Sequence, residues 1–360
     1  MKSKSLRLSL GGLLLLSIAA TWTDSNSQYL FVGTENNSCV LINNSGEVVA
    51  RSKAIPMGQF SDGVLPVILP KGGWGIMNAN GRITRISKDI EFSSALLSDP
   101  SHRTHFIFEF SEGLIGVNQH GKTGYMDTHC RLIIHPAFND ANGFSEGLAA
   151  VKIGKRWGFI NRSGKVVIKP TYEDASWFSE GLAPVKKDGK YGFIDTLGNV
   201  KIDFQFYSAG GFSEGLAEIT SDNLSGFINK KGRVAIPARF QYVSPLGFSD
   251  GLCSFATINS DGNYKYGYIN RKGQVVIQPI FEQAGNFSEG LAEVGFSSDD
   301  LMGKMRYGYI DKSGNLVLPL RFSKAEGFYH GLAEVHLPVE DGSDKDAYID
   351  RKGDIVWIAQ

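Results

Sequence analysis

Net charge and cysteine are both scarce in this chain of 360 residues, and each shortage excludes a class of protein. The 37 Lys and Arg side chains balance 37 Asp and Glu side chains, so the formal net charge is zero. Nucleic acids and anionic membrane surfaces select proteins with a basic excess, so we expect no nucleic-acid partner. The three cysteines, Cys39, Cys130 and Cys253, are an odd number and indicate no disulfide framework. We expect buried free thiols.

One apolar run stands apart from the rest of the chain. Basic residues precede a run from Leu8 to Ala20, small residues end it, and polar residues follow from Thr21. This order is typical of a secretory signal and is short for a membrane span. We therefore expect a signal peptide over residues 1–20, a short linker over 21–28 and an exported protein, whether periplasmic, on the cell surface or secreted. An uncleaved N-terminal anchor is the alternative, and no further membrane span is expected.

Catalytic and metal-binding signatures are also missing. The seven histidines fall at unrelated positions, without the spacing of a metal-binding helix motif. The segments Gly143–Gly147, Gly211–Gly215 and Gly247–Gly251 match Gly-x-Ser-x-Gly, but a nucleophile elbow needs one serine and a following helix, and this match recurs without a helical pattern. One acidic residue per repeat is too widely spaced to share a metal ion. We expect no enzyme activity, no cofactor and no metal.

A repeated phrase dominates what is present. It runs from Phe178 to Ile202 and reads Phe-Ser-Glu-Gly-Leu-Ala-Pro-Val, then Lys-Tyr-Gly-Phe-Ile-Asp, then Gly-Asn-Val-Lys-Ile. From Phe110 the phrase recurs every 34 residues as far as Phe212, and the spacing then grows to 36, 39 and 41 residues. A fixed period of this size is typical of a repeat architecture. The phrases open at Phe60, Phe110, Phe144, Phe178, Phe212, Phe248, Phe287 and Phe328.

Each repeat predicts three short strands, Leu182–Val185, Tyr191–Asp195 and Val200–Ile202 in the repeat quoted above. The second and third strands are joined by Asn or Asp, two residues, and Gly, which is typical of a type I turn with a bulge. Nine such turns occur, although the one at Asp127–Cys130 has lost its glycine. The first unit lacks the leading phrase, and residues 82–109 hold an insertion.

The direction of the strands predicts two unlike edges. The Phe-Ser-Glu-Gly corner and the Asn-x-x-Gly turn fall at the same end of the strands, and we expect a mixed, solvated rim there. Gly181, in the corner, is expected to need a positive φ or a close backbone approach. The loops between first and second strands lie at the other edge and lengthen at Thr257–Lys265, Gly295–Arg306 and His336–Asp346.

The phrase resembles the bacterial WG repeat, also called the KWG repeat. Trp74-Gly75 and Trp157-Gly158 carry the pair that names the family, and Tyr replaces Trp at Tyr191-Gly192 and Tyr307-Gly308. The likeness extends over about Tyr29 to Trp357. The resemblance implies a β-repeat protein, commonly thought propeller-like, without catalytic residues common to the family.

These observations predict an all-β chain in which residues 29–360 form one domain of about nine tandem antiparallel repeats of ~34–41 residues. Strands that are apolar on both faces favour sheets stacked around an axis, as in a β-propeller. An open β-hairpin solenoid is the alternative fold.

The predicted function is an exported, non-enzymatic binding or protein-interaction module that recognises an unidentified protein or cell-envelope ligand. Loops released from the repeat pattern are where repeat proteins place recognition. A hydrolase with its site in the same loops is the alternative. The residues expected in the binding loops are all acidic: Asp299, Asp300, Glu340, Asp341, Asp344 and Asp346.

Overall fold

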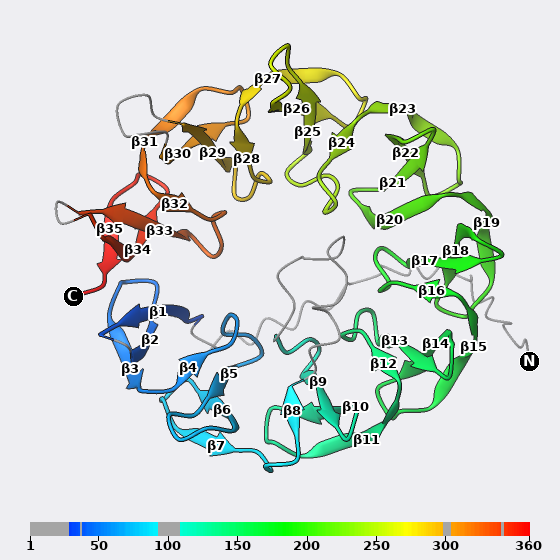
Figure 1. The fold of residues 1–360 in the computed structure, drawn as a ribbon, viewed down its shortest axis with the longest axis horizontal. Coiled ribbons are helices and arrows are strands. Elements are labelled where there is room, and N and C mark those ends of the chain that lie inside the picture. The colour runs from blue at the N-terminus through cyan, green and yellow to red at the C-terminus, as the bar shows by residue number, and fades with distance from the viewer. Residues whose placement is uncertain (1–28, 37, 93–108, 298–303, 340–341) are drawn as a thin grey trace, which may run out of the picture.

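The protein is a ring of nine small antiparallel sheets, seen in a computed structural model that describes residues 29–36, 38–92, 109–297, 304–339 and 342–360 (Figure 1). These residues form strands and turns and contain no helix. The first and last sheets lie side by side and close the ring, so the chain is a nine-bladed β-propeller. The predicted all-β repeat fold is confirmed, and the open solenoid is wrong.

Blades 4 to 8 are regular, with four strands each in the order of the chain from the centre of the ring outwards (Figure 1). Blade 4 is β12 (Asp140–Ala141), β13 (Leu148–Ile153), β14 (Arg156–Asn161) and β15 (Val166–Tyr172). Blade 5 is β16 (Asp174–Ala175), β17 (Leu182–Lys187), β18 (Lys190–Asp195) and β19 (Val200–Phe206). Blade 6 is β20 (Ser208–Ser213), β21 (Leu216–Ser221), β22 (Leu224–Asn229) and β23 (Val234–Phe240). Blade 7 is β24 (Tyr242–Val243), β25 (Leu252–Ile258), β26 (Tyr264–Asn270) and β27 (Val275–Phe281). Blade 8 is β28 (Gln283–Ala284), β29 (Leu291–Ser297), β30 (Met305–Asp311) and β31 (Leu316–Phe322).

Of the remaining four blades, three have the same four-stranded order and one lacks the inner strand. Blade 1 has three strands and no inner one: β1 (Phe31–Glu35), β2 (Ser38–Ile42) and β3 (Val48–Ser52). Blade 2 is β4 (Ile55–Pro56), β5 (Val64–Ile68), β6 (Trp74–Asn78) and β7 (Ile83–Arg85). Blade 3 is β8 (Glu91–Phe92), β9 (Leu114–Gln119), β10 (Lys122–Asp127) and β11 (Leu132–Phe138). Blade 9 is β32 (Lys324–Ala325), β33 (Leu332–Pro338), β34 (Asp344–Asp350) and β35 (Ile355–Ile358). The missing inner strand of blade 1 matches the missing first phrase.

The two turn types are built as their sequences predict. In the corner of blade 5, Ser179 and Leu182 exchange backbone hydrogen bonds, and Glu180 (φ 54°) and Gly181 (φ 84°) are both left-handed, which is a type I′ turn. At the next turn, the Asp195 side chain accepts hydrogen bonds from the backbone N–H groups of Leu197 and Asn199. The predicted positive φ of Gly181 is therefore confirmed.

The glycine that names the repeat is required by the outer strand. In blade 4 the pairing of β14 with β15 shifts between Trp157 and Phe159, so β15 bulges over Gly158. A Cβ atom at Gly158 would lie 2.5 Å from the carbonyl oxygen of Ile168 and 2.7 Å from the nitrogen of Pro170. Bulges on an outer strand are places where proline is tolerated, because no ladder hydrogen bond is lost. The glycine and the bulge thus form one local unit.

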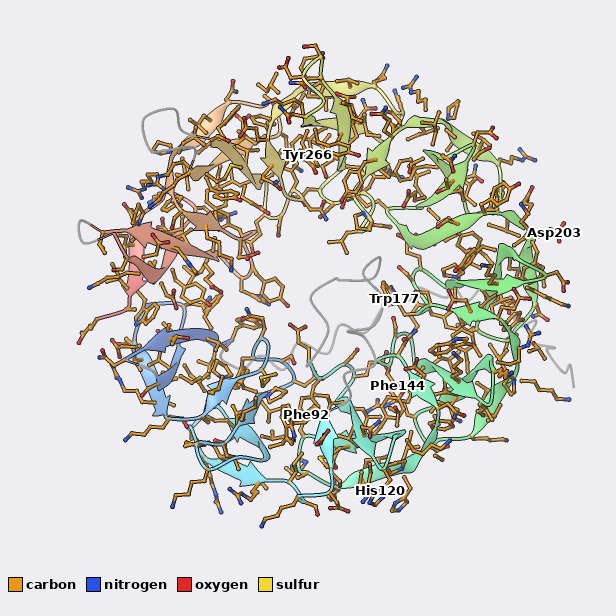
Figure 2. All side chains as sticks on the ribbon, in the orientation of Figure 1. Phe92, His120, Phe144, Trp177, Asp203 and Tyr266 are labelled. Carbon is orange, nitrogen blue, oxygen red and sulfur yellow. The ribbon has the colours of Figure 1, made fainter. Side chains whose placement is uncertain are left out.

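Neighbouring blades are packed by the corner phenylalanines. Phe178 opens the corner of blade 5 and its ring meets Phe159 of blade 4, with centroids 4.9 Å apart. Both side chains are buried. The same contact joins Phe193 to Phe212 and Tyr309 to Phe328. In Figure 2 the labelled Phe144 lies on the inner side of the ring and Asp203 of β19 lies at the outer rim.

The ring closes by packing between blades 9 and 1, and no sheet combines strands from both ends of the described chain. Phe31 of β1 takes the place of a corner phenylalanine and lies 5.1 Å from Tyr348 of β34, between ring centroids. The Tyr348 hydroxyl donates to the carbonyl oxygen of Val32 at 2.9 Å. Trp357 and Leu332 complete the buried cluster at this seam.

The structure corrects three details of the sequence interpretation. Each regular blade has a fourth, inner strand such as β16, which the preceding repeat supplies and which was not predicted. The long hairpin loops are also shorter than expected, because strand pairing continues to Ile258–Tyr264, Ser297–Met305 and Pro338–Asp344. Finally, only part of the predicted insertion is described: its first residues form β7 and β8, and residues 93–108 lie outside the described residues, as do the signal peptide and linker.

Candidate binding site on blades 8 and 9

The predicted binding residues divide into two groups. Asp299, Asp300, Glu340 and Asp341 lie outside the described residues. Asp344 and Asp346 were expected in a loop, but they belong to β34, because their backbone pairs with Pro338 and His336 of β33. Asp344 is exposed, and Asp346 is half-buried and points its carboxylate at His336, with Nε2 and Oδ1 3.4 Å apart.

The opposite edge of the ring is occupied by bonds between blades. The acidic side chain of each corner accepts a hydrogen bond from the backbone N–H of the glycine in the next corner, as from Gly181 to Glu146 at 3.0 Å. The corner serine donates to the next corner, as from Ser145 Oγ to the carbonyl oxygen of Phe178 at 2.7 Å. Seven acidic residues make this link: Asp62, Glu112, Glu146, Glu180, Glu214, Asp250 and Glu289.

Basic residues of the Asn-x-x-Gly turns join the same edge. Lys230 Nζ lies 2.9 Å from a carboxylate oxygen of Glu180 and also donates to the Glu180 carbonyl oxygen. Burial raises the pKa of Glu180, but hydrogen bonds from Lys230 and from the Gly215 N–H outweigh burial, so this pKa is lowered overall. The prediction that corners and turns share an edge is confirmed. The polar side chains of that edge bond largely to one another and to the backbone of neighbouring blades.

The Gly-x-Ser-x-Gly matches have no geometry for a nucleophile. Ser145 sits at the start of a two-residue hairpin instead of a strand-to-helix turn. Its hydroxyl hydrogen is used in the bond to the next corner. The hydroxyl groups of Ser213 and Ser249 are used in the same way. These serines hold blades together.

Charged side chains gather on the inner strands of blade 9. Lys324 Nζ lies 2.9 Å from Glu326 and 4.0 Å from Glu334. His336 Nε2 lies 3.7 Å from Glu334. Burial raises the pKa of the Glu334 carboxyl, although the positive charge of Lys324 opposes the change. Three carboxylates, including Asp346, thus surround one lysine and one histidine.

A cavity of about 170 Å³ lies beside this cluster, where blade 9 meets blades 1 and 2. Glu334, Asp346 and Tyr348 line it from blade 9. Thr34 of β1 and Gln59, just before the corner of blade 2, line the other side. The lining is therefore acidic on one wall and uncharged on the other.

A second cavity, of about 220 Å³, lies between blades 8 and 9. Glu293 and Tyr307 line it from blade 8, and Lys324 and Glu326 line it from blade 9. Glu293 Oε2 is buried and has no hydrogen-bond partner among the described residues. Burial, opposed by the Glu293 backbone N–H and reinforced by the charge of Glu326, raises the pKa of Glu293 to about 8.

The sequence analysis missed these residues, although a signal was present. The strand after the corner reads Leu-Ala-x-Val in four of the eight repeats and Leu-Ala-x-Ile in a fifth, and the variable position holds Glu218, Glu293 and Glu334 in blades 6, 8 and 9. A glutamate on a strand that is buried on both faces is unusual, because burying a charge is unfavourable unless it is paired. A glutamate at this position of the strand is therefore a candidate for a functional role.

Metal-binding clusters and membrane-spanning helices are absent from the described residues. Across the described ranges, no group of three or more His, Cys, Asp or Glu side chains could hold a metal ion. No helix in the described part of the chain is long and apolar enough to cross a membrane. Cys39 and Cys253 are buried free thiols, and Cys130 is a half-buried one.

Comparison with known proteins gives distant structural likenesses. A search of the curated protein sequences found no match. Among solved structures, the dihydro-heme d1 dehydrogenase NirN is 12% identical, with a TM-score of 0.45 over 92% of this chain and 73% of that one. A puromycin hydrolase is 10% identical, with a TM-score of 0.38 over 91% and 52%. A structure from a study of two prolyl endopeptidases is 9% identical, with a TM-score of 0.43 over 90% and 55%.

Comparison with protein families gives a direct answer. The family described as "WG containing repeat" matches six stretches: 124–157, 157–191, 191–224, 226–264, 266–295 and 307–335. Together they cover more than half of the chain, and they fall on blades 3 to 9. The bulge over the repeat's glycine recurs in blades 3 to 8. The chain belongs to the WG repeat family.

Proposed function

We propose that this protein is an exported, non-enzymatic interaction module that binds a partner protein with a basic surface through blades 8 and 9. The observation that carries the proposal is the concentration of acid there in a chain of zero net charge. Glu293, Glu326, Glu334, Asp344 and Asp346 all belong to these two blades. Complementary charge steers association and selects partners.

The two edges of the ring support this choice of surface. The corner edge uses its carboxylates, serines and several lysines and arginines in bonds between blades. The hairpin edge has strand ends that vary in length from blade to blade, with Asp344 exposed at the start of β34. A surface that can vary without breaking the repeated contacts is suited to recognition.

A non-enzymatic role is supported by the chemistry of the polar groups. A serine hydrolase needs a serine hydroxyl that a nearby base can deprotonate. The corner serines donate their hydroxyl hydrogens to main-chain oxygens, and they recur from blade to blade. His336 Nε2 lies 3.7 Å from a carboxylate oxygen of Glu334 and 3.4 Å from one of Asp346, and neither contact involves a serine or cysteine nucleophile.

The proposal is tested by capture of partners from a cell-envelope fraction with three immobilised proteins. The parent and an Arg271→Glu variant, changed on the corner edge, should capture the same partner. A double variant with Asp344→Lys and Asp346→Lys should capture it at least ~10-fold less well, because both contacts change sign. Equal capture by the double variant, or loss of capture by Arg271→Glu, would show that binding uses another surface.

Export is tested separately. Mass spectrometry of the protein recovered from outside the cytoplasm should give an N-terminus near Thr21, because the residues before it form a cleavable signal pattern. A mature protein that retains Met1 would contradict cleavage.

A further inference from the structure

The cavity between blades 8 and 9 contains an unsatisfied acid. Glu293 Oε2 is the one buried side-chain oxygen or nitrogen in the described ranges that lacks a hydrogen-bond partner. A buried carboxyl group without a partner is unfavourable, because its lost hydration is not replaced, so native structures rarely keep one without a reason. A ligand that donates a hydrogen bond to Glu293 Oε2 would supply the missing partner.

The matching glutamate of blade 6 shows that the repeat can satisfy an acid at this position. Glu218 accepts a hydrogen bond from Ser225 Oγ at 2.6 Å. In blade 8 the position of Ser225 is taken by Tyr307, which lines the cavity. Blade 8 therefore has the acid without the internal donor.

The backbone beside Glu293 leaves room for its carboxylate. A Cβ atom placed on Gly285 would lie 1.6 Å from Glu293 Oε1, so any larger residue would displace the side chain. Blade 6 also has a glycine, Gly210, next to Glu218. The carboxylate thus lies against bare backbone on one side and the cavity on the other.

The lining favours a cationic group with several hydrogen-bond donors. Glu326 adds a second carboxylate from blade 9, and Lys324 is already bonded to Glu326 at 2.9 Å. Tyr307 contributes an aromatic ring, whose face attracts cations. A metal ion would need more ligands than the described residues supply, since no such group is present among them.

We infer that the cavity between blades 8 and 9 is a binding site for a primary ammonium group on an alkyl chain, with Glu293 as its main acceptor. An ammonium carries three donors on a narrow stem, which suits a cavity of about 220 Å³. The inference deepens the proposed function and rests on it, because a lysine side chain of a basic partner carries this group. A free alkylamine carries the same group.

Binding at this site is coupled to a proton. The charged and titratable groups that face Glu293 are Tyr268 of β26, Tyr307 and Tyr309 of β30, and Lys324 and Glu326 of blade 9. Burial raises the pKa of Glu293 to about 8, so the empty site holds a carboxylic acid at neutral pH. An ammonium prefers the carboxylate, so its binding releases the Glu293 proton.

Calorimetric titration with n-butylammonium chloride tests the site. The affinity of the full-length protein should rise by up to about tenfold per pH unit between about pH 6 and pH 8 and level off above that. Glu293→Gln, which mimics the protonated acid, should abolish binding, and Glu218→Gln, the matched change in blade 6, should leave binding intact. Thermal unfolding of both variants confirms that they are folded.

A second titration distinguishes the sources of the ammonium. Nα-acetyl-lysine amide should bind with the same dependence on Glu293 if the natural group is a lysine side chain, and only the smaller amine should bind if it is a free alkylamine. The inference is overturned if butylammonium does not bind the parent at about pH 8.5, or binds Glu293→Gln equally well. The proposed function fails on a different result, unchanged partner capture after charge reversal at Asp344 and Asp346.

Discussion

At the residue scale, the corners hold acids in a backbone conformation that acids seldom adopt. Glu146, Glu180 and Glu214 have φ values of 53°, 54° and 50°. A left-handed conformation disfavours residues other than Gly, Asn and Asp by roughly 1 kcal/mol. The conformation places each carboxylate where it accepts the N–H of the next corner's glycine. The local strain therefore serves the joint between blades.

Replacing the two glycines of a repeat should destabilise the fold for different reasons. Gly192 has an ordinary φ, but a Cβ there would lie 2.6 Å from the Ile202 carbonyl oxygen, so Gly192→Ala should destabilise the fold by about 1–3 kcal/mol through overpacking. A Cβ atom at Gly181 would have nothing within 4 Å. Gly181→Ala should therefore lower the free energy of unfolding by only roughly 1 kcal/mol, which is the penalty for an alanine in the left-handed conformation. Chemical denaturation measures both. A larger loss at Gly181 would show that space, not φ, limits the corner.

At the scale of the element, sequence reasoning predicted the blade far better than the site. Periodic turns such as Asn161–Gly164 are local, so their residues determine their shape and position. The inner strand β16 was missed because two residues carry no pattern and pair only in the folded blade. Glu293 was missed because its lack of a partner depends on Gly285 and on blade 9, which the sequence around it does not specify.

The joint between corners is also an element that can be weakened selectively. Glu180 accepts from the Gly215 N–H and pairs with Lys230, which together outweigh burial and lower its pKa. Because a lowered pKa stabilises the fold above the ordinary glutamate pKa, that contribution is lost as pH falls through the lowered value. Glu180→Gln should therefore lose roughly 1 kcal/mol at pH ~7, and this loss should shrink as the pH falls below the ordinary glutamate pKa.

Thermal unfolding of the two proteins across this pH range measures the difference, with Glu180→Ala as the variant that also loses the acceptor. A difference between parent and Glu180→Gln that persists undiminished at pH ~3 would show that the ionised carboxylate is not its source.

At the scale of the whole molecule, seven joints of the ring carry a link between corners, and in the described residues the two joints on either side of blade 1 carry none. The corner of blade 9 holds His330 in place of an acid, and Asn44 of blade 1 donates to the His330 carbonyl oxygen at 3.0 Å. Tyr29 packs against Tyr329 and His330. The seam therefore depends on side-chain packing and on hydrogen bonds other than the corner link, and it borders the acidic cavity of blades 9, 1 and 2.

The seam should be the place where the ring opens. Phe31 and Phe178 are both buried and make equivalent ring contacts, at 5.1 and 4.9 Å, so Phe31→Ala and Phe178→Ala should each cost about 3–5 kcal/mol. At blade 5, the links from Ser145 and Glu146 remain after the change. At the seam the described residues offer no corner link, and the hydrogen bonds from Asn44 to His330 and from Tyr348 to Val32 remain. Because these lack the acid and serine links of a corner, we expect only Phe31→Ala to separate the blades.

Native-state hydrogen exchange and X-ray scattering distinguish the two variants. Phe31→Ala should speed exchange in β1, β2 and β34 while β17 and β18 keep the rates of the parent, because local opening then requires less free energy than global unfolding. Its radius of gyration should exceed that of Phe178→Ala, whose ring stays closed. The same exchange pattern and radius for both variants would mean that closure relies on all nine joints equally, and that the packing of Phe31 against Tyr348 is one contact among many.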